Sequence, residues 1–562
     1  MKSIFLKPAL FVATTGLLLA SCGTPGLSID AEPITMEGGL VLKNAELNDD
    51  QLKNWTNADL GTDTIPGMSV EKAYSEIIDP SQVEGKTVIV AVLDSGTDIE
   101  HEDLDDVLWV NEGEIPNNNI DDDNNGYVDD IHGWNFLGDM VGANLNFTRI
   151  VRELKPKYEG KDESEISPEN MEEYELYQSA KAEWEKEYEP TKQRKEQFEM
   201  LANRLNEAHA SLSQKIGKED FTVEELQAME ADNDTLQMQK MMMLSLLQQA
   251  DGGYAAIKSQ IEGGLDYFND KLEYHLNLDF KAREITGDDH HDINDLNYGN
   301  NDVDGPEEDK KNAKHGTHVA GIIAAERNNG IGMNGVANNV KIMVIRAVPN
   351  GDEYDKDIAL GIRYAVDNGA DIINASFGKS FSSHPEWVLD ALKYAAEKDV
   401  LFVHAAGNDA LNLDENRNYP NDQWPGQTEE VTNNVLTVGA LNHRLGEGLV
   451  APFSNYGATN VDVFAPGMEF YSTTPLNEYE FLQGTSMAAP AVSGIAAVIR
   501  SYYPKLSAQQ VKQIIMNSGI PIDAKVLVPG GEEQLEDFSS LSVSGRIANL
   551  YNALIMADQM SK

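Results

Sequence analysis

The chain has 562 residues, of which 41% are hydrophobic and only 7% aromatic, enough to bury one large core or two of ordinary size. It carries 94 acidic residues against 43 Lys and Arg, a formal net charge of -51. This charge repels a phosphate backbone and no basic patch interrupts it, so the composition excludes nucleic acid as an expected partner.

The N-terminus has the layout of a secretory signal. Lys2 and Lys7 precede the apolar run PALFVATTGLLLA, which is too short to remain as a membrane-spanning anchor. The run ends in LASC, which resembles the lipobox of bacterial lipoproteins, and Cys22 is the single cysteine. The resemblance implies cleavage before Cys22, acylation of that residue and an exported lipoprotein at the outer membrane or cell surface. A cysteine that follows an ordinary signal by chance is the alternative.

Continuous apolar runs predict buried parallel strands. The first, KTVIVAVL at 86–93, lies between a glycine and the sequence DSG. Similar runs follow at 340–348, 370–376, 400–407 and 435–440, with helical stretches at 356–369 and 386–399. This alternation predicts an α/β fold with a doubly wound, mostly parallel sheet covered on both faces. In that architecture ligands bind just past the carboxyl ends of strands.

An acidic loop, NNNIDDDNNGYVDD at 117–130, follows the first strand. In the register of a calcium-binding loop, the ligand positions are Asp121, Asp123, Asn125, the carbonyl of Tyr127 and Asp129. Position 12 is His132 instead of the bidentate glutamate of an EF-hand, and no flanking helices are evident. The loop therefore predicts a structural Ca²⁺ site or a solvated acidic turn, and excludes a calcium-sensing switch.

A long helical block follows the loop. Apolar residues recur at spacings of three and four from Phe198 to Ile216 and from Tyr254 to Leu272, and Thr222 with Glu225 forms a capping box. We expect an all-α insertion that packs as a bundle or hairpin between about 165 and 280. No residue in it looks catalytic, so it would restrict access, hold a partner or only stabilise the fold.

These patterns divide the chain into five parts. They are a signal peptide at 1–21, an N-terminal anchor or linker at 22–60, the first part of the α/β domain at 61–140, the helical insertion at 141–285 and the second part of the domain at 286–562.

Four polar residues stand at the ends of predicted strands or the starts of predicted helices. Asp94 follows the first strand in VLDSG, His315 opens HGTHVAGIIAA, Asn408 lies in HAAGND, and Ser486 lies in GTSMAAPAVSG. Together and in this order, these segments resemble the subtilisin-like serine proteases. The resemblance implies a three-layer α/β/α fold, a catalytic triad of Asp94, His315 and Ser486, and Asn408 as an oxyanion donor.

Each of these residue types suits its implied role. A serine hydroxyl is a poor nucleophile, so Ser486 needs His315 to remove its proton. Asp94 would fix the imidazole tautomer and stabilise the imidazolium. His315 and His318, three positions apart, leave a metal pair as an alternative, but no glutamate at metalloprotease spacing and no cysteine accompanies them.

The resemblance extends to the segments that would bind a polypeptide substrate. INASFGK matches the substrate-binding strand, where Ser376, Phe377 and Gly378 would pair with the substrate backbone. AAGN matches one wall of the primary specificity pocket, with Ala405, Ala406 and Gly407. VPNGDEY matches the opposite edge, with Gly351 and Asp352; there Asp352 and Glu353 would favour a basic substrate residue or be merely solvated acids.

The resemblance also bears on calcium and on activation. Relatives carry similar acidic loops as structural calcium sites, in which Asp130 would replace the missing carboxylate. Asp103 and Asn328 match a second calcium site, although one extra residue interrupts the match.

No organic cofactor is implied. About forty residues separate Cys22 from TIPGMSVEKAY, which resembles the start of a mature enzyme, so we expect folding without a conventional prodomain.

The sequence therefore predicts a lipid-anchored serine endopeptidase with structural calcium. A catalytically idle protease scaffold, whose insertion binds a partner, is the alternative. The sequence leaves the cleavage specificity and the oligomeric state open.

Overall fold

A computed structural model describes residues 27, 29–36, 46–78, 83–248, 252–424, 427–531 and 533–562. The predicted signal peptide and Cys22 lie outside the described residues. Within these ranges, no helix combines the length and the apolar character that a membrane crossing requires.

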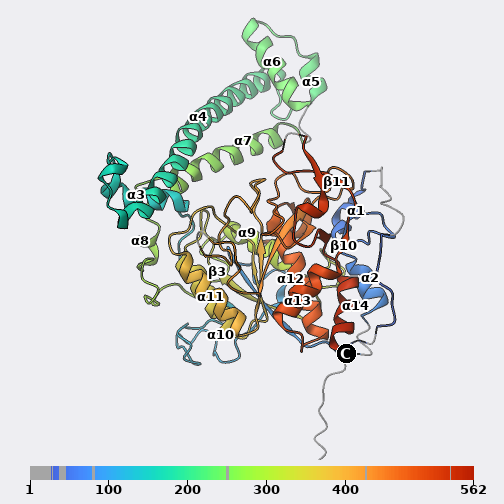
Figure 1. Cartoon of the computed structure of the whole chain (residues 1–562). Helices are drawn as coiled ribbons and strands as arrows, with labels where there is room; N and C mark the ends of the chain where they lie inside the picture. Colours follow the sequence, from blue (N-terminus) through green and yellow to red (C-terminus); the bar gives the residue numbers. More distant parts are fainter. Residues whose placement is uncertain are drawn as a thin grey trace, which may run out of the picture.

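A nine-stranded sheet lies at the centre of the described chain (Figure 1). Its order is β10-β13-β7-β6-β5-β4-β1-β3-β2, and every neighbouring pair except β10 and β13 is parallel. The strands are β1 Val88–Asp94, β2 Gly133–Asn135, β3 Val340–Arg346, β4 Ile372–Ala375, β5 Leu401–Ala405, β6 Val435–Leu441, β7 Val463–Pro466, β10 Ile520–Pro521 and β13 Arg546–Ile547. All five apolar runs that predicted strands lie in this sheet.

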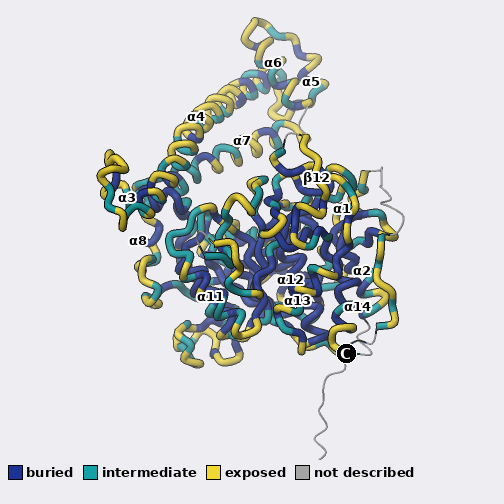
Figure 2. Tube along the Cα trace, viewed as in Figure 1, coloured by how far each residue is buried: buried dark blue, intermediate teal, exposed yellow. Residues whose placement is uncertain are grey.

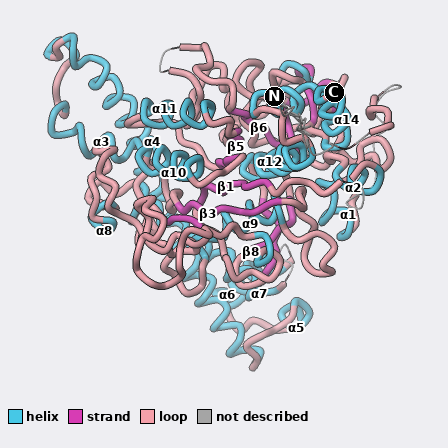
Figure 3. The backbone as a smooth tube through the Cα atoms, turned by 90° about the horizontal axis from the view of Figure 1, so that it is seen from below, coloured by secondary structure: helices cyan, strands magenta, loops and turns pink. Residues whose placement is uncertain are grey.

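The sheet is buried on both faces, which explains its uninterrupted apolar runs. Val88, Val90 and Val92 of β1 point into one core, and Ala91 and Leu93 point into the other. The first core contains residues of α9 Lys314–Ala324, α12 Thr485–Tyr502, α13 Ala508–Ser518 and α14 Leu550–Ser561; the second contains residues of α10 Asp355–Asp367 and α11 Pro385–Glu397. The predicted three-layer α/β/α fold is thus confirmed, and Figure 3 shows the strands in the interior among the helices.

Smaller elements complete the body. Two antiparallel ribbons pair β8 Phe470–Thr474 with β9 Glu478–Leu482, and β11 Lys525–Leu527 with β12 Leu535–Asp537. Two short helices, α1 Asp49–Asn54 and α2 Val70–Glu76, precede β1.

The insertion is helical, as predicted. Its helices are α3 Asn146–Tyr158, α4 Met171–Ile216, α5 Val223–Ala228, α6 Asp234–Leu247, α7 Gly253–Asp270 and α8 Arg283–Thr286, and a π-helical turn, Lys271–His275, continues α7. The capping box of Thr222 and Glu225 starts α5. Helix α4 extends much further toward the N-terminus than the Phe198–Ile216 pattern indicates. The pattern missed its first half because that half is mostly polar and its buried residues are largely tyrosines and small residues.

The insertion has two apolar clusters, one at its base and one at its tip. At the base, Phe147 and Ile150 of α3 pack with Tyr174 and Tyr177 of α4. At the tip, the end of α4 packs with α5, α6 and α7. Figures 1 and 2 show α4 and α7 as an arm that leaves the body and carries many exposed residues. The insertion therefore meets the α/β body mainly at its base.

Candidate active site

The carboxyl ends of three neighbouring strands carry most of the predicted site. Asp94 is the last residue of β1, Ser376 follows β4, and Asn408 follows β5. The other two predicted groups, His315 and Ser486, are each the second residue of a buried helix, α9 and α12. Three parallel strands and two helix starts thus bring residues far apart in sequence to one edge of the sheet.

Asp94 and His315 form a close pair. His315 Nδ1 lies 2.7 Å from Asp94 Oδ1, which also accepts the Ser95 N–H at 2.7 Å. The Asp94 side chain is 1% exposed, whereas the His315 side chain is 38% exposed and reaches solvent. Burial lowers the pKa of His315, but the Asp94 charge and hydrogen bond outweigh it and leave this pKa raised.

Gly316 allows α9 to approach this strand end. A Cβ at this position would lie 2.0 Å from the carbonyl oxygen of Gly96, closer than any side chain tolerates. The glycine that follows His315 in the sequence HGTH is therefore a packing requirement of the Asp94–His315 pair.

Ser486 is fixed by bonds to the end of β4. Its Oγ donates to the carbonyl of Ser376 at 3.0 Å, and Ser376 Oγ donates to the carbonyl of Ser486 at 2.8 Å. The Ser486 hydroxyl must therefore rotate before it bonds to an imidazole. An open hollow lined by His315, Met487, Phe481 and Leu482 adjoins the start of α12.

The amide of Asn408 is oriented by Thr485. Asn408 Oδ1 accepts the Thr485 N–H at 2.8 Å and the Thr485 hydroxyl at 3.0 Å. These two bonds occupy the amide oxygen, so Nδ2 is the atom left to donate to a ligand. Asn408 is exposed beside the start of α12, where backbone N–H groups and the helix dipole also favour negative charge.

The two predicted substrate walls lie on either side of Asn418. Asn418 Nδ2 donates to the carbonyl of Ala406 at 3.0 Å. A Cβ atom added to Gly378 would lie 2.5 Å from Asn418 Oδ1. Asn418 thus lies between the predicted substrate strand (376–378) and the wall at 405–407. The sequence did not indicate it, because it belongs to an irregular loop without periodicity or motif.

The opposite edge is covered by the insertion. Asp352 Oδ2 accepts the N–H of Asn146, the first residue of α3, at 2.7 Å. Arg149 donates to the carbonyls of Asp352 at 2.9 Å and Glu353 at 2.8 Å. Glu353 is 2% exposed and its carboxylate lies 3.7 Å from Lys379 Nζ. The expectation of solvated acids is therefore wrong for Glu353, because α3 packs over this edge; the half-buried Gly351 lies beside it.

His318 belongs to the packing of α9. It is buried, and its Nε2 lies 3.1 Å from the carbonyls of both Phe470 and Glu480. Burial lowers the pKa of His318 to about 3, so the ring is neutral and donates to these carbonyls. The alternative of a metal pair formed by His315 and His318 is excluded by this arrangement.

The acidic loop brings some of the predicted calcium ligands together. Asp123 and Asp130 converge with Glu114, which the sequence did not single out, and one oxygen of each lies within 4.8 Å of the others. Asn125 Nδ2 lies 3.2 Å from Asp123 and 3.1 Å from Asp130. Burial raises the pKa of Asp130 to about 6. This carboxylate cluster, in which Glu114 and Asp130 are buried, has the ligand chemistry that Ca²⁺ prefers.

Other predicted calcium ligands take different places. Asp121 accepts the N–H groups of Asn125 and Gly126, and Asp129 accepts those of Asn118 and Asn119. The Tyr127 ring packs edge-on against Trp134 and Tyr364. At the second predicted site, Asn329 donates to Asp103 at 2.6 Å, whereas the Asn328 N–H donates to Asn334. The extra residue in that loop thus places Asn329, not Asn328, beside Asp103.

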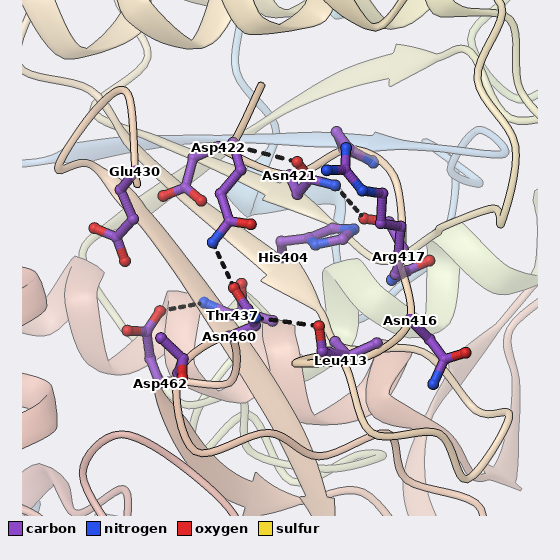
Figure 4. A pocket seen from close by; sticks show the side chains of 14 residues that line it. His404, Leu413, Asn416, Arg417, Asn421, Asp422, Glu430, Thr437, Asn460 and Asp462 are labelled. Atoms are coloured by element: carbon purple, nitrogen blue, oxygen red, sulfur yellow. Dashed lines mark hydrogen bonds between the residues drawn. The ribbon is translucent and has the colours of Figure 1, made fainter. Parts of the chain in front are cut away.

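A second pocket lies behind the predicted substrate strand (Figure 4). His404 on its wall lies 2.8 Å from the carbonyl of Phe377. Figure 4 shows Asp422, Glu430 and Asp462 on one side of the pocket and Arg417 on the other. Burial and the nearby Glu430 raise the pKa of Asp422 to about 7, although Lys512 opposes this. Asp422 and Glu430 come from the connection between β5 and β6 and Asp462 from the connection between β6 and β7, so no local pattern indicated this acid group.

Comparisons with known proteins agree with the geometry. The family model described as peptidase S8, the subtilase family, matches residues 85–540. The chain is 43% identical over 188 residues to a thermophilic serine proteinase of Bacillus sp. (strain AK1), a match that covers 33% of this chain and 42% of that protein. It is 40% identical over 204 residues to subtilisin DY of Bacillus licheniformis, covering 35% of this chain and 67% of that protein.

A third relative shows the same partial coverage. Subtilisin-like protease 1 of Plasmodium vivax is 32% identical over 274 residues, covering 46% of this chain and 42% of that protein. The chain thus covers less than half the length of two of these relatives and about two thirds of subtilisin DY.

Proposed function

Because this chain belongs to the subtilase family, we propose that it is a serine endopeptidase that cleaves polypeptides through Asp94, His315 and Ser486. The observation that carries the proposal is the 2.7 Å bond between buried Asp94 and solvent-accessible His315, next to the helix that begins at Ser486. A charged acid beneath a reachable imidazole is the arrangement that general-base catalysis requires.

The chemistry follows from these positions. Ser486 Oγ attacks the substrate carbonyl carbon while His315 takes the hydroxyl proton, and Asp94 stabilises the resulting imidazolium. The carbonyl oxygen becomes an oxyanion that accepts hydrogen bonds from Asn408 Nδ2 and the Ser486 N–H. His315 then gives its proton to the leaving amine, which departs from the acyl-enzyme. Water, deprotonated by His315, hydrolyses the ester and restores Ser486.

Substrate binding would use the backbone of segments on both sides of the cleft. A substrate strand would pair with Ser376–Gly378 on one side and with Gly351–Asp352 on the other. The residue before the scissile bond would enter the space between 376–378 and 405–407, where Asn418 offers a neutral polar surface.

Structural calcium and lipid anchoring belong to the same proposal. Glu114, Asp123 and Asp130 would hold a Ca²⁺ that braces the loop after β1, because their carboxylate oxygens converge. Acylation of Cys22 is supported by the resemblance of LASC to a lipobox. Incorporation of an alkyne-labelled fatty acid in wild-type cells but not in Cys22→Ala cells tests the anchor; labelling of both would contradict it.

A fluorophosphonate probe tests the catalytic proposal. The probe reacts with a serine hydroxyl only where a base and an oxyanion site activate it. We expect the purified full chain to be labelled, and Ser486→Ala, His315→Ala and heat-denatured protein to be unlabelled. Labelling that survives Ser486→Ala would overturn the assignment of the nucleophile, and an unlabelled folded wild type would favour an idle scaffold.

A further inference from the structure

A cluster of three histidines and a glutamate joins the insertion to the α/β body. Glu153 lies on α3, His290 and His291 follow α8, and His384 immediately precedes α11. Figure 1 shows α3, α8 and α11 on the same side of the molecule. The catalytic proposal uses none of these four side chains.

The donor atoms of the cluster have the spacing of metal ligands. Glu153 Oε1 lies 3.3 Å from His290 Nε2, and Glu153 Oε2 lies 3.4 Å from His291 Nε2. One ligand atom from each of these residues lies within 4.8 Å of the other two. Zinc ligands at about 2.0–2.1 Å in a tetrahedron are separated by about 3.3–3.4 Å, so the observed spacing fits a small divalent ion.

Hydrogen bonds behind His291 fix which ring nitrogen faces Glu153 without a proton. Glu386 Oε1 lies 3.3 Å from His384 Nδ1, and His384 Nε2 lies 3.0 Å from His291 Nδ1. With both rings neutral, His384 Nδ1–H donates to Glu386, and His291 Nδ1–H donates to His384. The His291 Nε2 lone pair then points at a carboxylate oxygen. Outer partners of this kind orient metal-bound histidines.

A lone pair that faces a carboxylate needs a cation between them. His290 can donate an Nε2–H to Glu153 as a neutral ring, but His291, whose Nδ1 donates to His384, could do so only as an imidazolium. That imidazolium would lie beside the His290 ring, with ring centroids 4.1 Å apart, and near the Arg152 guanidinium, which already lies 3.4 Å from Glu153. A single divalent ion satisfies both imidazoles and the carboxylate at once. Imidazole and carboxylate ligands suit Zn²⁺ and exclude softer, thiolate-preferring ions.

We propose that Glu153, His290 and His291 form a Zn²⁺-class site, with His384 as the residue that positions His291. The His291 side chain is 45% exposed, so water would complete the coordination from the solvent side. The ion would connect α3 to the segment after α8 and, through His384, to α11. It would therefore hold the insertion on the body beside the cleft edge at 352–353 that α3 covers.

Metal binding to the full chain in a Ser486→Ala background tests the site. This background prevents autolysis and makes the result independent of the catalytic proposal. Chelator-treated protein, held in saturating Ca²⁺ to fill the acidic loop, is titrated with Zn²⁺ by calorimetry. We expect one tight equivalent of Zn²⁺ and, with Co²⁺ as probe, the visible absorption of a tetrahedral site. Zn²⁺ should also raise the Tm.

Substitutions separate this cluster from adventitious binding. We expect His291→Gln and Glu153→Gln each to weaken Zn²⁺ binding by about 100-fold or more, and His384→Gln by about 10–100-fold. His443→Gln is the matched control, because His443 pairs with Glu469 at 2.8 Å without a second imidazole; it should keep full affinity. The chelator-treated variants should keep the Tm of chelator-treated parent protein.

Two results would overturn the site. One is the absence of a tight Zn²⁺ equivalent in the parent protein. The other is an equivalent that His291→Gln and Glu153→Gln leave unchanged. If His291→Gln unfolds, Glu153→Gln and His384→Gln decide the question, because the first keeps the side-chain size and the second lies outside the ligand set.

Discussion

At the scale of single residues, hydrogen bonds set the direction in which each catalytic group acts. Thr485 occupies the oxygen of the Asn408 amide and so presents its nitrogen, while Asp94 holds one nitrogen of His315 and leaves the other for the substrate side. These neighbouring groups determine which hydrogen bonds each catalytic side chain can still make, which the residue type alone does not determine.

Replacement of Asn408 by alanine should lower kcat with little change in KM. The oxyanion exists only during the reaction, so its donor stabilises the transition state more than bound substrate. We expect a loss of about 10²–10³-fold, the loss found when the equivalent donor is removed from subtilisin. Steady-state kinetics on a peptide substrate measures it, and a change confined to KM would contradict this role.

The pH dependence of activity should report the Asp94–His315 pair. His315 acts as a base only when neutral, so kcat/KM must fall as pH drops through its pKa, which Asp94 raises above the ordinary value. In Asp94→Asn the charge is absent, so the acid limb should move to lower pH while kcat falls about 10⁴-fold. An acid limb that stays in place in Asp94→Asn would show that another group titrates.

At the scale of elements, helix α3 is the joint between the insertion and the cleft. Arg149 is 2% exposed and donates to the carbonyls of Asn144, Asp352 and Glu353, and its guanidinium lies 4.0 Å from the Tyr354 ring centre. Asp352 in turn accepts from the first turn of α3. The edge that would bind substrate is therefore built on the insertion, so the insertion cannot be an independent appendage.

Arg149→Met should loosen this joint. Three buried carbonyls lose their donor, at about 1–3 kcal/mol each when nothing replaces it, so we expect the free energy of unfolding to fall by roughly 3–5 kcal/mol. Urea unfolding in the Ser486→Ala background measures the loss, and hydrogen exchange should quicken at 350–354. Arg194→Met, at an exposed position of α4, is the control and should change little. Equal effects of both variants would argue against a specific joint.

At the scale of the whole molecule, a chain with a net charge of -51 and a single cysteine must hold together without internal disulfides. The large two-faced core supplies most of this stability. Acid clusters such as Glu114, Asp123 and Asp130 add repulsion that a bound cation would remove.

Calcium should therefore raise the stability of the chelator-treated protein. At a Ca²⁺ concentration about 100 times the Kd, the gain is about 2.7 kcal/mol. Asp130→Asn should abolish the Tm increase on adding Ca²⁺. Asp121→Asn should retain it, because Asp121 accepts backbone N–H groups of the turn instead of joining the cluster. If both variants lost the Tm increase equally, the loop would bind calcium in the register predicted from its sequence, with Asp121 as a ligand.

Local sequence was sufficient for the sheet and the flanking helices, whereas the four residues of the candidate triad and oxyanion donor were implied by the family resemblance of their segments. Apolar runs indicate strands that are buried on both faces. The motifs lie at strand and helix ends, and the carboxyl ends of parallel strands meet at one edge of the sheet. The helices of the insertion were predictable for the same reason, except where α4 is polar and its periodicity is weak.

Only the tertiary structure decided which distant residues meet. Asn418 between the substrate walls, Glu114 in the acidic cluster, Asn329 in place of Asn328, and the cluster of Glu153, His290, His291 and His384 each join segments separated in the chain. A sequence pattern records the environment along one element, whereas a binding site depends on which elements pack together. The burial of Glu353 is the clearest case, because it follows from α3, about 200 residues earlier in the chain, packing over its loop.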